Sequence, residues 1–493
     1  MTTAMEHATT FAIPTYRLRD VGETVERYDE NFWRNGHAVP LVVFDDSSPA
    51  THDKYYPGLE RTRTHNDLFY VGPKQKAEFV RLLVDRLGDR KLESVVKNLF
   101  RPSYGGNRNF TLMYTLGGFL VSSDDDMRPT ALIENSVESL DADEICRGKL
   151  VHAGSDGFTR HSFDILRAFH DVLGRRVAEI PSNYATGEHL VDATMDLETN
   201  TSTGVARETS LVLSRGDVGA DAVVKVAQTF RTGTNDIDAI DFVDLFLQDD
   251  SAHRLEDLND LYVLVNFRPA VTNKNWRMDC GVAAYDNRNG LPPFFPTRLR
   301  FEDYIYRLWV QRPGIVAAHV DAVQNHIRNN YMRNPLAAEV FNEEIANLVK
   351  RKLKSHHYAL EELTVRFDYE GDVSTADTSE ILDRIATLHR RVLDGARLAV
   401  SDERQRSLRA FAENLEKTFY GFDPDFFQQN VSRIVDDVVS QIQGALDVWP
   451  TLIEICYFRK HTRDLPKVRV QNVHLGAGAR DGLAATTSVA GSC

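Results

Sequence analysis

The sequence reads Gly105-Gly106-Asn107-Arg108-Asn109, then Phe110 to Val121, then Ser122-Ser123-Asp124-Asp125-Asp126-Met127-Arg128-Pro129. This pattern predicts a glycine turn, an amphipathic helix and a short apolar strand at 119–121, with three carboxylates where the strand runs out into a loop. In an open α/β sheet, the carboxyl ends of the strands border the crevice that binds ligands. Carboxylates there can hold a divalent cation against a diphosphate. With 72 acidic residues among 493, such a run also arises by chance, so the run taken alone favours a solvated acidic loop, and only its setting indicates a binding site.

The segments before this stretch predict a parallel βαβ unit. A strand is expected at 12–17, a helix at 21–35, and a strongly apolar strand at 39–44 that ends in Asp45-Asp46-Ser47-Ser48. A right-handed crossover between the two strands makes them parallel. Helices expected at 73–87 and 92–99 then lead to the central stretch. The first 130 residues are therefore predicted to be doubly wound.

The composition is that of a globular protein with one large and one smaller domain, or with two or three ordinary domains. The formal net charge of −14 repels polyanions and argues against a nucleic-acid partner. Four cysteines lie far apart without a CxxC pair, which favours a reducing cytoplasm over a disulfide framework or a structural zinc site. We find no signal peptide and no apolar run long enough to span a membrane, so we expect a cytoplasmic protein without a transmembrane segment.

The pattern weakens from 140 to 260 and becomes helical toward the C-terminus. We expect a helix at 161–173, strands at 223–226 and 261–267, a loop at 229–240, and a helix that opens with Arg300 to Trp309. Beyond Gly314 the apolar periodicity is that of helices, and those at 381–398, 408–419 and 426–448 have clear N-terminal signals. Their apolar stripes fit either packing on the rest of the chain or a homo-oligomer interface. The tail is rich in Gly, Ala, Ser and Thr and is expected to be disordered.

Five short segments carry a resemblance to a known family. In order along the chain, they are Ile13-Pro14-Thr15-Tyr16, Val42-Val43-Phe44-Asp45-Asp46-Ser47-Ser48, Arg108-Asn109, Asp124-Asp125-Asp126 and Glu302-Asp303. In this order and in these settings they resemble the motifs of the family-2-like glycosyltransferases of the GT-A fold, including the Asp-x-Asp motif and the Glu-Asp pair that begins a helix. The resemblance covers roughly residues 10–135 and 260–330. Each motif is weak alone, and their order carries the comparison.

The resemblance implies an α/β fold of the GT-A type, a doubly wound and mostly parallel sheet that binds a nucleotide-diphospho-sugar. The transferase domain would comprise residues 12–330, after a flexible N-terminus at 1–11. Asp126 and Glu302 lie farther apart than is usual in the family, so residues of about 140–260 are expected to form an insertion. A mainly helical region at 331–465 and a disordered tail at 466–493 would complete the chain.

The resemblance also implies roles for particular residues. Nucleotide contacts would come from Pro14, Thr15, Asp45, Asp46, Arg108, Asp124 and Asp125. Asp124 and Asp126 would bracket Mn²⁺ or Mg²⁺ on the diphosphate, and His326 would supply an imidazole ligand. A surface histidine beside a helix is an equally good interpretation of His326. In inverting members the Glu-Asp pair supplies the general base, here Asp303, with Glu302 as the second choice.

The function that follows is metal-dependent transfer of a sugar from a nucleotide-diphosphate donor to an acceptor hydroxyl, with UDP favoured over GDP. One alternative is a nucleotidyltransferase of similar fold, although residues 15–25 lack the Gly-rich, basic loop expected after the first strand. Another is a non-catalytic scaffold or glycan-binding protein with the same fold. The sequence identifies neither the sugar nor the acceptor, nor whether the anomeric configuration is inverted or retained.

Overall fold

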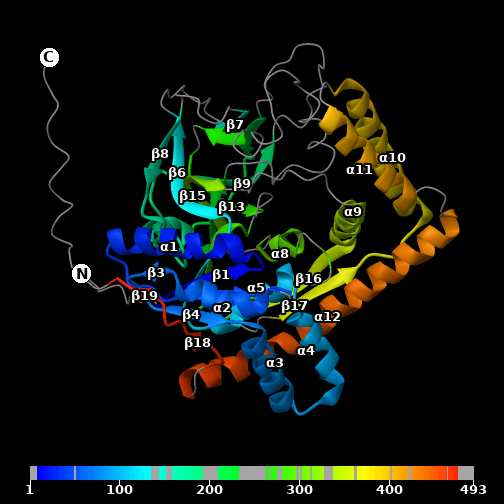
Figure 1. The fold of residues 1–493 in the computed structure, drawn as a ribbon. Helices are drawn as coiled ribbons and strands as arrows, with labels where there is room; N and C mark the ends of the chain where they lie inside the picture. The colour runs from blue at the N-terminus through cyan, green and yellow to red at the C-terminus, as the bar shows by residue number, and fades with distance from the viewer. Residues whose placement is uncertain are drawn as a thin grey trace, which may run out of the picture.

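The computed structural model describes residues 8–48, 51–134, 144–150, 158–192, 209–231, 262–265, 268–274, 280–295, 299, 302–310, 314–326, 337–359, 364–399, 402–419, 423–462 and 465–475. The described part is a mixed α/β fold in which one large sheet carries helices on both faces and further helices follow toward the C-terminus (Figure 1). Fifteen strands of this part belong to the sheet.

The part of the sheet that β1 (Thr9–Thr15), β2 (Leu41–Asp45), β4 (Leu68–Val71) and β5 (Phe119–Ser123) form is parallel. β1 pairs with β2 on one side and with β5 on the other, and β2 pairs with β4. The chain thus moves outward from β1 to β4 and then returns to place β5 on the opposite side of β1. The carboxyl ends of β1 and β5 therefore form a topological switch point, where open α/β sheets bind ligands.

Alternate residues of these strands contribute to two separate cores. Phe11, Ile13 and Val43 pack with α1 (Leu18–Arg34) and α2 (His52–Glu60) on one face. Ala12, Val42 and Phe44 pack on the other face with α3 (Pro73–Leu87), α4 (Glu93–Leu99) and α5 (Tyr104–Tyr114). Because successive side chains of a strand point to opposite faces, apolar runs such as 41–44 supply both cores. This arrangement agrees with the predicted doubly wound fold of the first 130 residues.

Beyond β5 the strand pairings are of both kinds. β14 (Val282–Asp286) is antiparallel to β5 and to β11 (Val223–Arg231), and β11 is parallel to β15 (Ile315–His326). From β15 the sheet continues, in this order, with β13 (Ala270–Lys274), β9 (Ala185–Asp192), β10 (Thr209–Leu213), β7 (Glu144–Leu150) and β12 (Tyr262–Val265). A branch also leaves β15, where β6 (Met127–Glu134) pairs with β15 and with β8 (Phe158–Ser162). The region of about 140–260, predicted to be an insertion, therefore supplies β11 to the middle of the main sheet.

Three local predictions in this region were wrong. The segment after Gly314, predicted to be helical, is the strand β15, whose residues are buried on both faces and so lack the period-two alternation of a half-exposed strand. The helix predicted at 161–173 is shorter, because β8 extends to Ser162 and α6 (Ile165–His170) begins after the N-cap Asp164. The loop predicted at 229–240 begins as strand, since β11 continues to Arg231, and the remainder lies outside the described residues.

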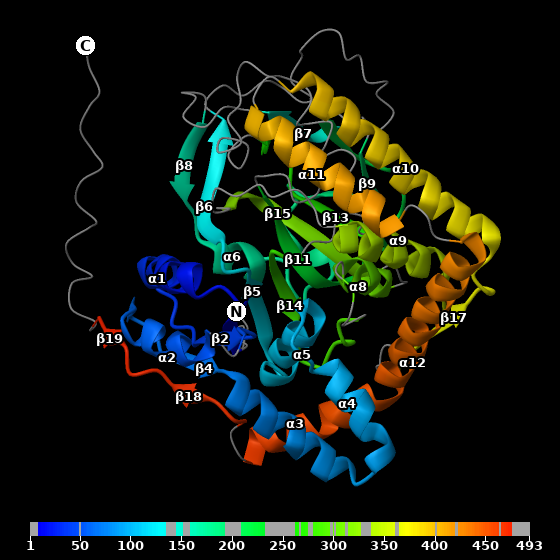
Figure 2. The same cartoon turned by 45° about the vertical axis from the view of Figure 1, so that its right-hand side comes forward.

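The C-terminal region contains α9 (Ala337–Lys352), the hairpin of β16 (Leu353–Ala359) and β17 (Thr364–Tyr369), α10 (Thr375–Leu398), α11 (Asp402–Phe419) and α12 (Pro424–Thr462). Figure 2 shows α10 and α11 side by side, and α12 running back beneath them to α3 and α4. Trp449 on α12 is buried, stacks near Phe100 at 6.1 Å and donates from Nε1 to the Leu291 carbonyl at 2.6 Å. The apolar face of α12 thus packs on the same core as α3 to α5.

Both chain ends contain more ordered structure than predicted. β1 begins at Thr9, within the segment expected to be a flexible N-terminus. In the tail, β18 (Val468–Arg469) pairs with β4, and β19 (Val473–His474) pairs with β3 (Arg63–Thr64). Backbone hydrogen bonds hold β18 to the main sheet and β19 to β3 in a separate two-stranded sheet, and side-chain composition does not reveal such bonds. Residues 1–7 and 476–493 lie outside the described part. Across the described residues, none of the helices combines the length and apolarity needed to cross a membrane.

Candidate functional site

The helix α5 brings Arg108 to the carboxyl end of β5. Its N-cap is Ser103, whose hydroxyl accepts from the Gly106 amide at 3.0 Å, so the helix begins at Tyr104 and includes the glycine pair that was predicted to form a preceding turn. Gly106 is required for close packing, because a Cβ there would lie 2.0 Å from the Arg101 carbonyl oxygen. The tight first turn fixes the direction of α5 and therefore the position of Arg108.

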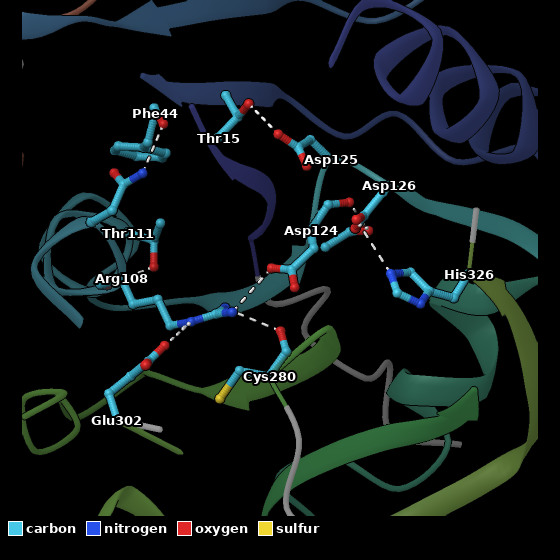
Figure 3. A network of polar contacts seen from close by, with 12 residues as sticks. Thr15, Phe44, Arg108, Thr111, Asp124, Asp125, Asp126, Cys280, Glu302 and His326 are labelled. Atoms are coloured by element: carbon cyan, nitrogen blue, oxygen red, sulfur yellow. Dashed lines mark hydrogen bonds and ion pairs between the residues drawn. The ribbon is translucent and has the colours of Figure 1, made fainter. Parts of the chain in front are cut away.

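Arg108 connects three segments that are far apart in the sequence (Figure 3). Its guanidinium donates to Asp124 Oδ1 at 3.0 Å, to the Cys280 carbonyl at 3.0 Å and to Glu302 Oε1 at 3.2 Å. Arg108 and Glu302 are buried, whereas the Asp124 side chain is 34% exposed. Cys280 reaches this point because β14 pairs with β5, and the Asp124 amide donates to the Gly281 carbonyl at 2.8 Å.

Glu302 is the first residue of α8 (Glu302–Val310). Burial raises its pKa to about 7, with Asp303 adding to the shift and Arg108 opposing it. Asp303 is half-buried. The Glu-Asp pair therefore begins a helix as predicted, with Glu302 directed at Arg108.

Asp125 is a buried carboxylate tied to the end of β1. Its Oδ2 accepts from the Thr15 hydroxyl at 2.5 Å, and Thr15 in turn contacts the Tyr55 hydroxyl at 2.8 Å. Arg17 Nε lies 3.5 Å from Asp125 Oδ1. Burial raises the pKa of Asp125 to about 7 despite the neighbouring Arg17. Pro14, the other β1 residue predicted to line the site, is half-buried one position earlier on the strand.

Asp126 contacts Arg17 and His326 through a single oxygen. Arg17 donates to Asp126 Oδ2 at 2.5 Å, and His326 Nε2 lies 3.3 Å from the same atom. Burial alone would raise the pKa of Asp126, but His326 and Arg17 outweigh it and hold the pKa below its usual range. His326 is 3% exposed and ends the strand β15, where it pairs with Met127. The surface-histidine interpretation was therefore wrong.

The residues proposed as metal ligands are only partly brought together. Among the described residues, no group of three or more His, Cys, Asp or Glu side chains is arranged to hold a metal ion. Asp124 is directed at Arg108, which leaves Asp126 and His326 as the converging pair. Their separation of 3.3 Å is that of an ion pair or hydrogen bond between the two side chains. It is also close to the distance of about 3 Å between two neighbouring ligands of one divalent cation. One or two protein ligands suffice where substrate phosphates complete the coordination shell.

Asp45 and Asp46 follow β2 and have different partners. Asp45 is fully buried and accepts from the Tyr70 hydroxyl at 2.7 Å. Asp46 pairs with Lys76 on α3, and its other oxygen accepts from the Ser103 amide at 3.0 Å. Burial raises the pKa of Asp46 against the opposing effect of Lys76. Through Ser103, Asp46 is linked to the start of the helix that carries Arg108.

A cavity of about 1070 Å³ opens beside Asp45, Asp46 and Lys76. Its volume is close to that of sites that bind nucleotides and other small molecules, about 300–1,000 Å³. Apolar side chains (Ala77, Val80, Val84, Phe100 and Phe110) and charged side chains (Arg81, Asp85, Arg90, Glu93, Lys97 and Arg101) contribute to its walls. The cavity extends from the end of β2 along α3 and α4, and the contacts of Arg108 described above lie outside its lining.

Arg17 and Lys76 lie in the site but were not predicted from the sequence. Arg17 directly follows the Pro14-Thr15-Tyr16 segment, so its proximity to the β1 end was available as a signal. Lys76 gives no such signal, because a lysine on an amphipathic helix is usually solvated and its burial depends on distant Asp46 and Asn107.

The comparisons with known proteins do not identify a family for this chain. No protein-family model matches the sequence, and no curated protein matches it either. Among solved structures, the chain is similar to the mannosyltransferase PcManGT from Pyrobaculum calidifontis in complex with GDP-Man and Mn²⁺, at 12% identity and a TM-score of 0.28, over 93% of this chain and 88% of that chain. A TM-score this low supports no argument about function.

Proposed function

We propose that the protein is a metal-dependent glycosyltransferase of the GT-A type that moves a sugar from a nucleotide-diphosphate donor to an acceptor hydroxyl. The observation that carries the proposal is the convergence of Arg108, Asp124, Asp126, Glu302 and His326 from α5, the β5–β6 loop, α8 and β15 at the switch point of the sheet. An acidic loop that was merely solvated would not place Asp125 and Asp126 in the interior beside cationic partners.

The donor would lie across the carboxyl ends of β2, β1 and β5. Asp46, next to the cavity, would accept hydrogen bonds from the base, with Asp45, Pro14 and Thr15 shaping the wall behind it. Asp126 and His326 would hold Mn²⁺ or Mg²⁺, which would neutralise the diphosphate as it leaves. Asp124 and Asp125 would contribute negative charge and hydrogen-bond acceptors around the ribose and the ion.

Arg108 and the Glu-Asp pair would act at the sugar end of the donor. Glu302 is buried and holds Arg108, so its role would be to position that cation near the phosphates. Asp303 is half-buried on the same helix turn and would act as the general base that accepts the acceptor proton. This assignment keeps Asp303 as the base and makes Glu302 a positioning residue.

A thermal-shift screen of UDP, GDP, CDP and TDP, each with and without MnCl₂, tests the proposal. A ligand that binds only the folded state raises Tm, so we expect stabilisation that requires Mn²⁺. The resemblance in sequence favours UDP, so we expect the largest shift with this nucleotide. Asp126→Asn should abolish the metal-dependent part, while Asp53→Asn, at an exposed carboxylate on α2, should retain it.

Two results would contradict the proposal. Stabilisation by none of the nucleotides, with or without metal, would favour the non-catalytic scaffold. Release of pyrophosphate from a nucleoside triphosphate and a sugar phosphate, without hydrolysis or transfer from a nucleotide-sugar, would favour the nucleotidyltransferase.

A further inference from the structure

Arg17 is a cation on the carboxylate that the proposed metal would use. Its NH1 lies 2.5 Å from Asp126 Oδ2, and its Nε lies 3.5 Å from Asp125 Oδ1. The Asp125 and Asp126 side chains are only 3% and 5% exposed, whereas the Arg17 side chain is 35% exposed. The Arg17 guanidinium therefore lies beside two buried carboxylates, and part of the Arg17 side chain is exposed to solvent.

The oxygen bound by Arg17 is also the one that faces His326. His326 Nε2 approaches Asp126 Oδ2 at 3.3 Å, so an ion shared by these two residues would contact the same oxygen as the guanidinium. A divalent ion and a guanidinium on one oxygen would repel each other within a few ångströms, in a setting where water screens poorly. An ion held on this oxygen would therefore favour withdrawal of Arg17.

The surroundings of Arg17 permit that withdrawal. Its guanidinium lies 5.2 Å from the centre of the Tyr16 ring, which is itself 51% exposed. Arg128, another arginine beside the motif, is 7% exposed at its side chain and is bound to Thr24, Glu23 and the Met127 carbonyl. Of the arginines at positions 17, 108 and 128, Arg17 is the one whose side chain reaches solvent.

We propose that Arg17 is a displaceable cation, which neutralises the Asp125–Asp126 pair in the free protein and moves onto the donor diphosphate when a divalent cation takes Asp126. This inference rests on the proposed function. A guanidinium can bind a phosphate through two parallel hydrogen bonds. Arg17 would thus exchange its single hydrogen bond to Asp126 for a bidentate contact with the donor phosphate. Metal and donor should then bind cooperatively, because each favours the displaced position of Arg17.

Binding of Mn²⁺, measured from the loss of the free-ion signal in electron paramagnetic resonance, tests this directly. In the absence of nucleotide, Arg17→Gln should bind Mn²⁺ about tenfold more tightly than the unchanged protein, since no charge-assisted hydrogen bond must be broken. At saturating Mn²⁺, the same variant should bind UDP or GDP about tenfold more weakly, because the phosphate loses its guanidinium.

Two further variants complete the test. Arg34→Gln, which removes an exposed arginine paired with Glu30 on α1, should leave both affinities unchanged. Arg17→Lys keeps the charge that the two carboxylates require, so it should fold even if Arg17→Gln does not. It should bind Mn²⁺ as the unchanged protein does and bind the nucleotide more weakly, since an ammonium lacks the planar fork.

The outcomes separate this inference from the proposed function. If Arg17→Gln binds Mn²⁺ no more tightly than the unchanged protein, or Arg17→Lys binds nucleotide equally well, Arg17 is not a displaceable cation, although the transferase proposal stands. If the unchanged protein binds neither Mn²⁺ nor a nucleoside diphosphate, both are overturned.

Discussion

Replacement of Arg108 by Met tests whether the buried network holds the site together. The substitution keeps much of the side-chain length but leaves Glu302 buried without its cation and frees the Cys280 carbonyl. Removing one partner of a buried ion pair costs about 3–5 kcal/mol. The contact with Asp124 adds at most about 1 kcal/mol, because that carboxylate is one-third exposed and can be hydrated. We therefore expect Arg108→Met to lower the free energy of unfolding by about 4 kcal/mol at neutral pH.

Glu302 gives this penalty a characteristic pH dependence. Its pKa is raised by burial to about 7, so its contribution to stability is present at acid pH and is lost as the pH rises through 7. Without Arg108 the pKa should rise further, so the penalty of the substitution should grow between pH 5.5 and pH 8. Adding Glu302→Gln removes the uncompensated charge and should restore about half of the lost stability.

Urea denaturation followed by circular dichroism at the two pH values measures these differences. Arg34→Met, at an exposed pair with Glu30, is the matched control and should cost less than about 0.5 kcal/mol. A penalty below about 1 kcal/mol for Arg108→Met, or one that neither pH nor Glu302→Gln changes, would show that Arg108 does not compensate the buried charge of Glu302.

Three further predictions concern neighbouring parts of the site. Gly106→Ala should lower Tm by several degrees, because the new Cβ would lie 2.0 Å from the Arg101 carbonyl oxygen. The control Gly22→Ala on α1 should be tolerated, since a Cβ there meets only ordinary contacts. Equal Tm values for the two variants would show that Gly106 is not required for close packing. Burial raises the pKa of Asp125 to about 7, so the stability of the protein should fall as the pH rises from 4 to 7. In a pH series of Tm measurements, Asp125→Asn should flatten that decline. An unchanged decline would exclude Asp125 as its source. Asp126→Asn should weaken Mn²⁺ binding in calorimetry at least about tenfold, and undiminished binding would place the ion elsewhere.

Sequence patterns predicted the parallel N-terminal part of the sheet because its signals are local. β2 and β5 are short apolar runs that end in carboxylates, and their lengths and flanking residues identify them as strands. β15 could not be recognised in this way, because it is buried on both faces and its sequence mixes apolar residues with buried polar ones such as His319 and Gln324, so it shows no alternation of apolar and polar residues. The start of α5 was misplaced since the Gly105-Gly106 pair favours a turn unless Ser103 is recognised as its N-cap.

The residues of the candidate site that belong to short sequence motifs could be predicted. The contacts between residues that are distant in the sequence could not. Asp124, Asp126 and Glu302 were identified through the order of their motifs, and the structure brings Asp124 and Glu302 together through Arg108. The Cys280 carbonyl is a backbone acceptor, for which no side-chain pattern exists. The contact of Arg17 with Asp126 depends on how the loop after β1 meets the end of β5, which only the pairing of these strands determines.

The proposed metal site is tested most directly by the anomalous scattering from a crystal of the protein grown with Mn²⁺ and UDP. We expect one strong peak within about 2.3 Å of both Asp126 and His326, with the diphosphate completing the coordination and Arg108 and Arg17 beside the phosphates. A manganese peak away from Asp126, or a nucleotide bound outside the carboxyl ends of β1, β2 and β5, would contradict the proposed site.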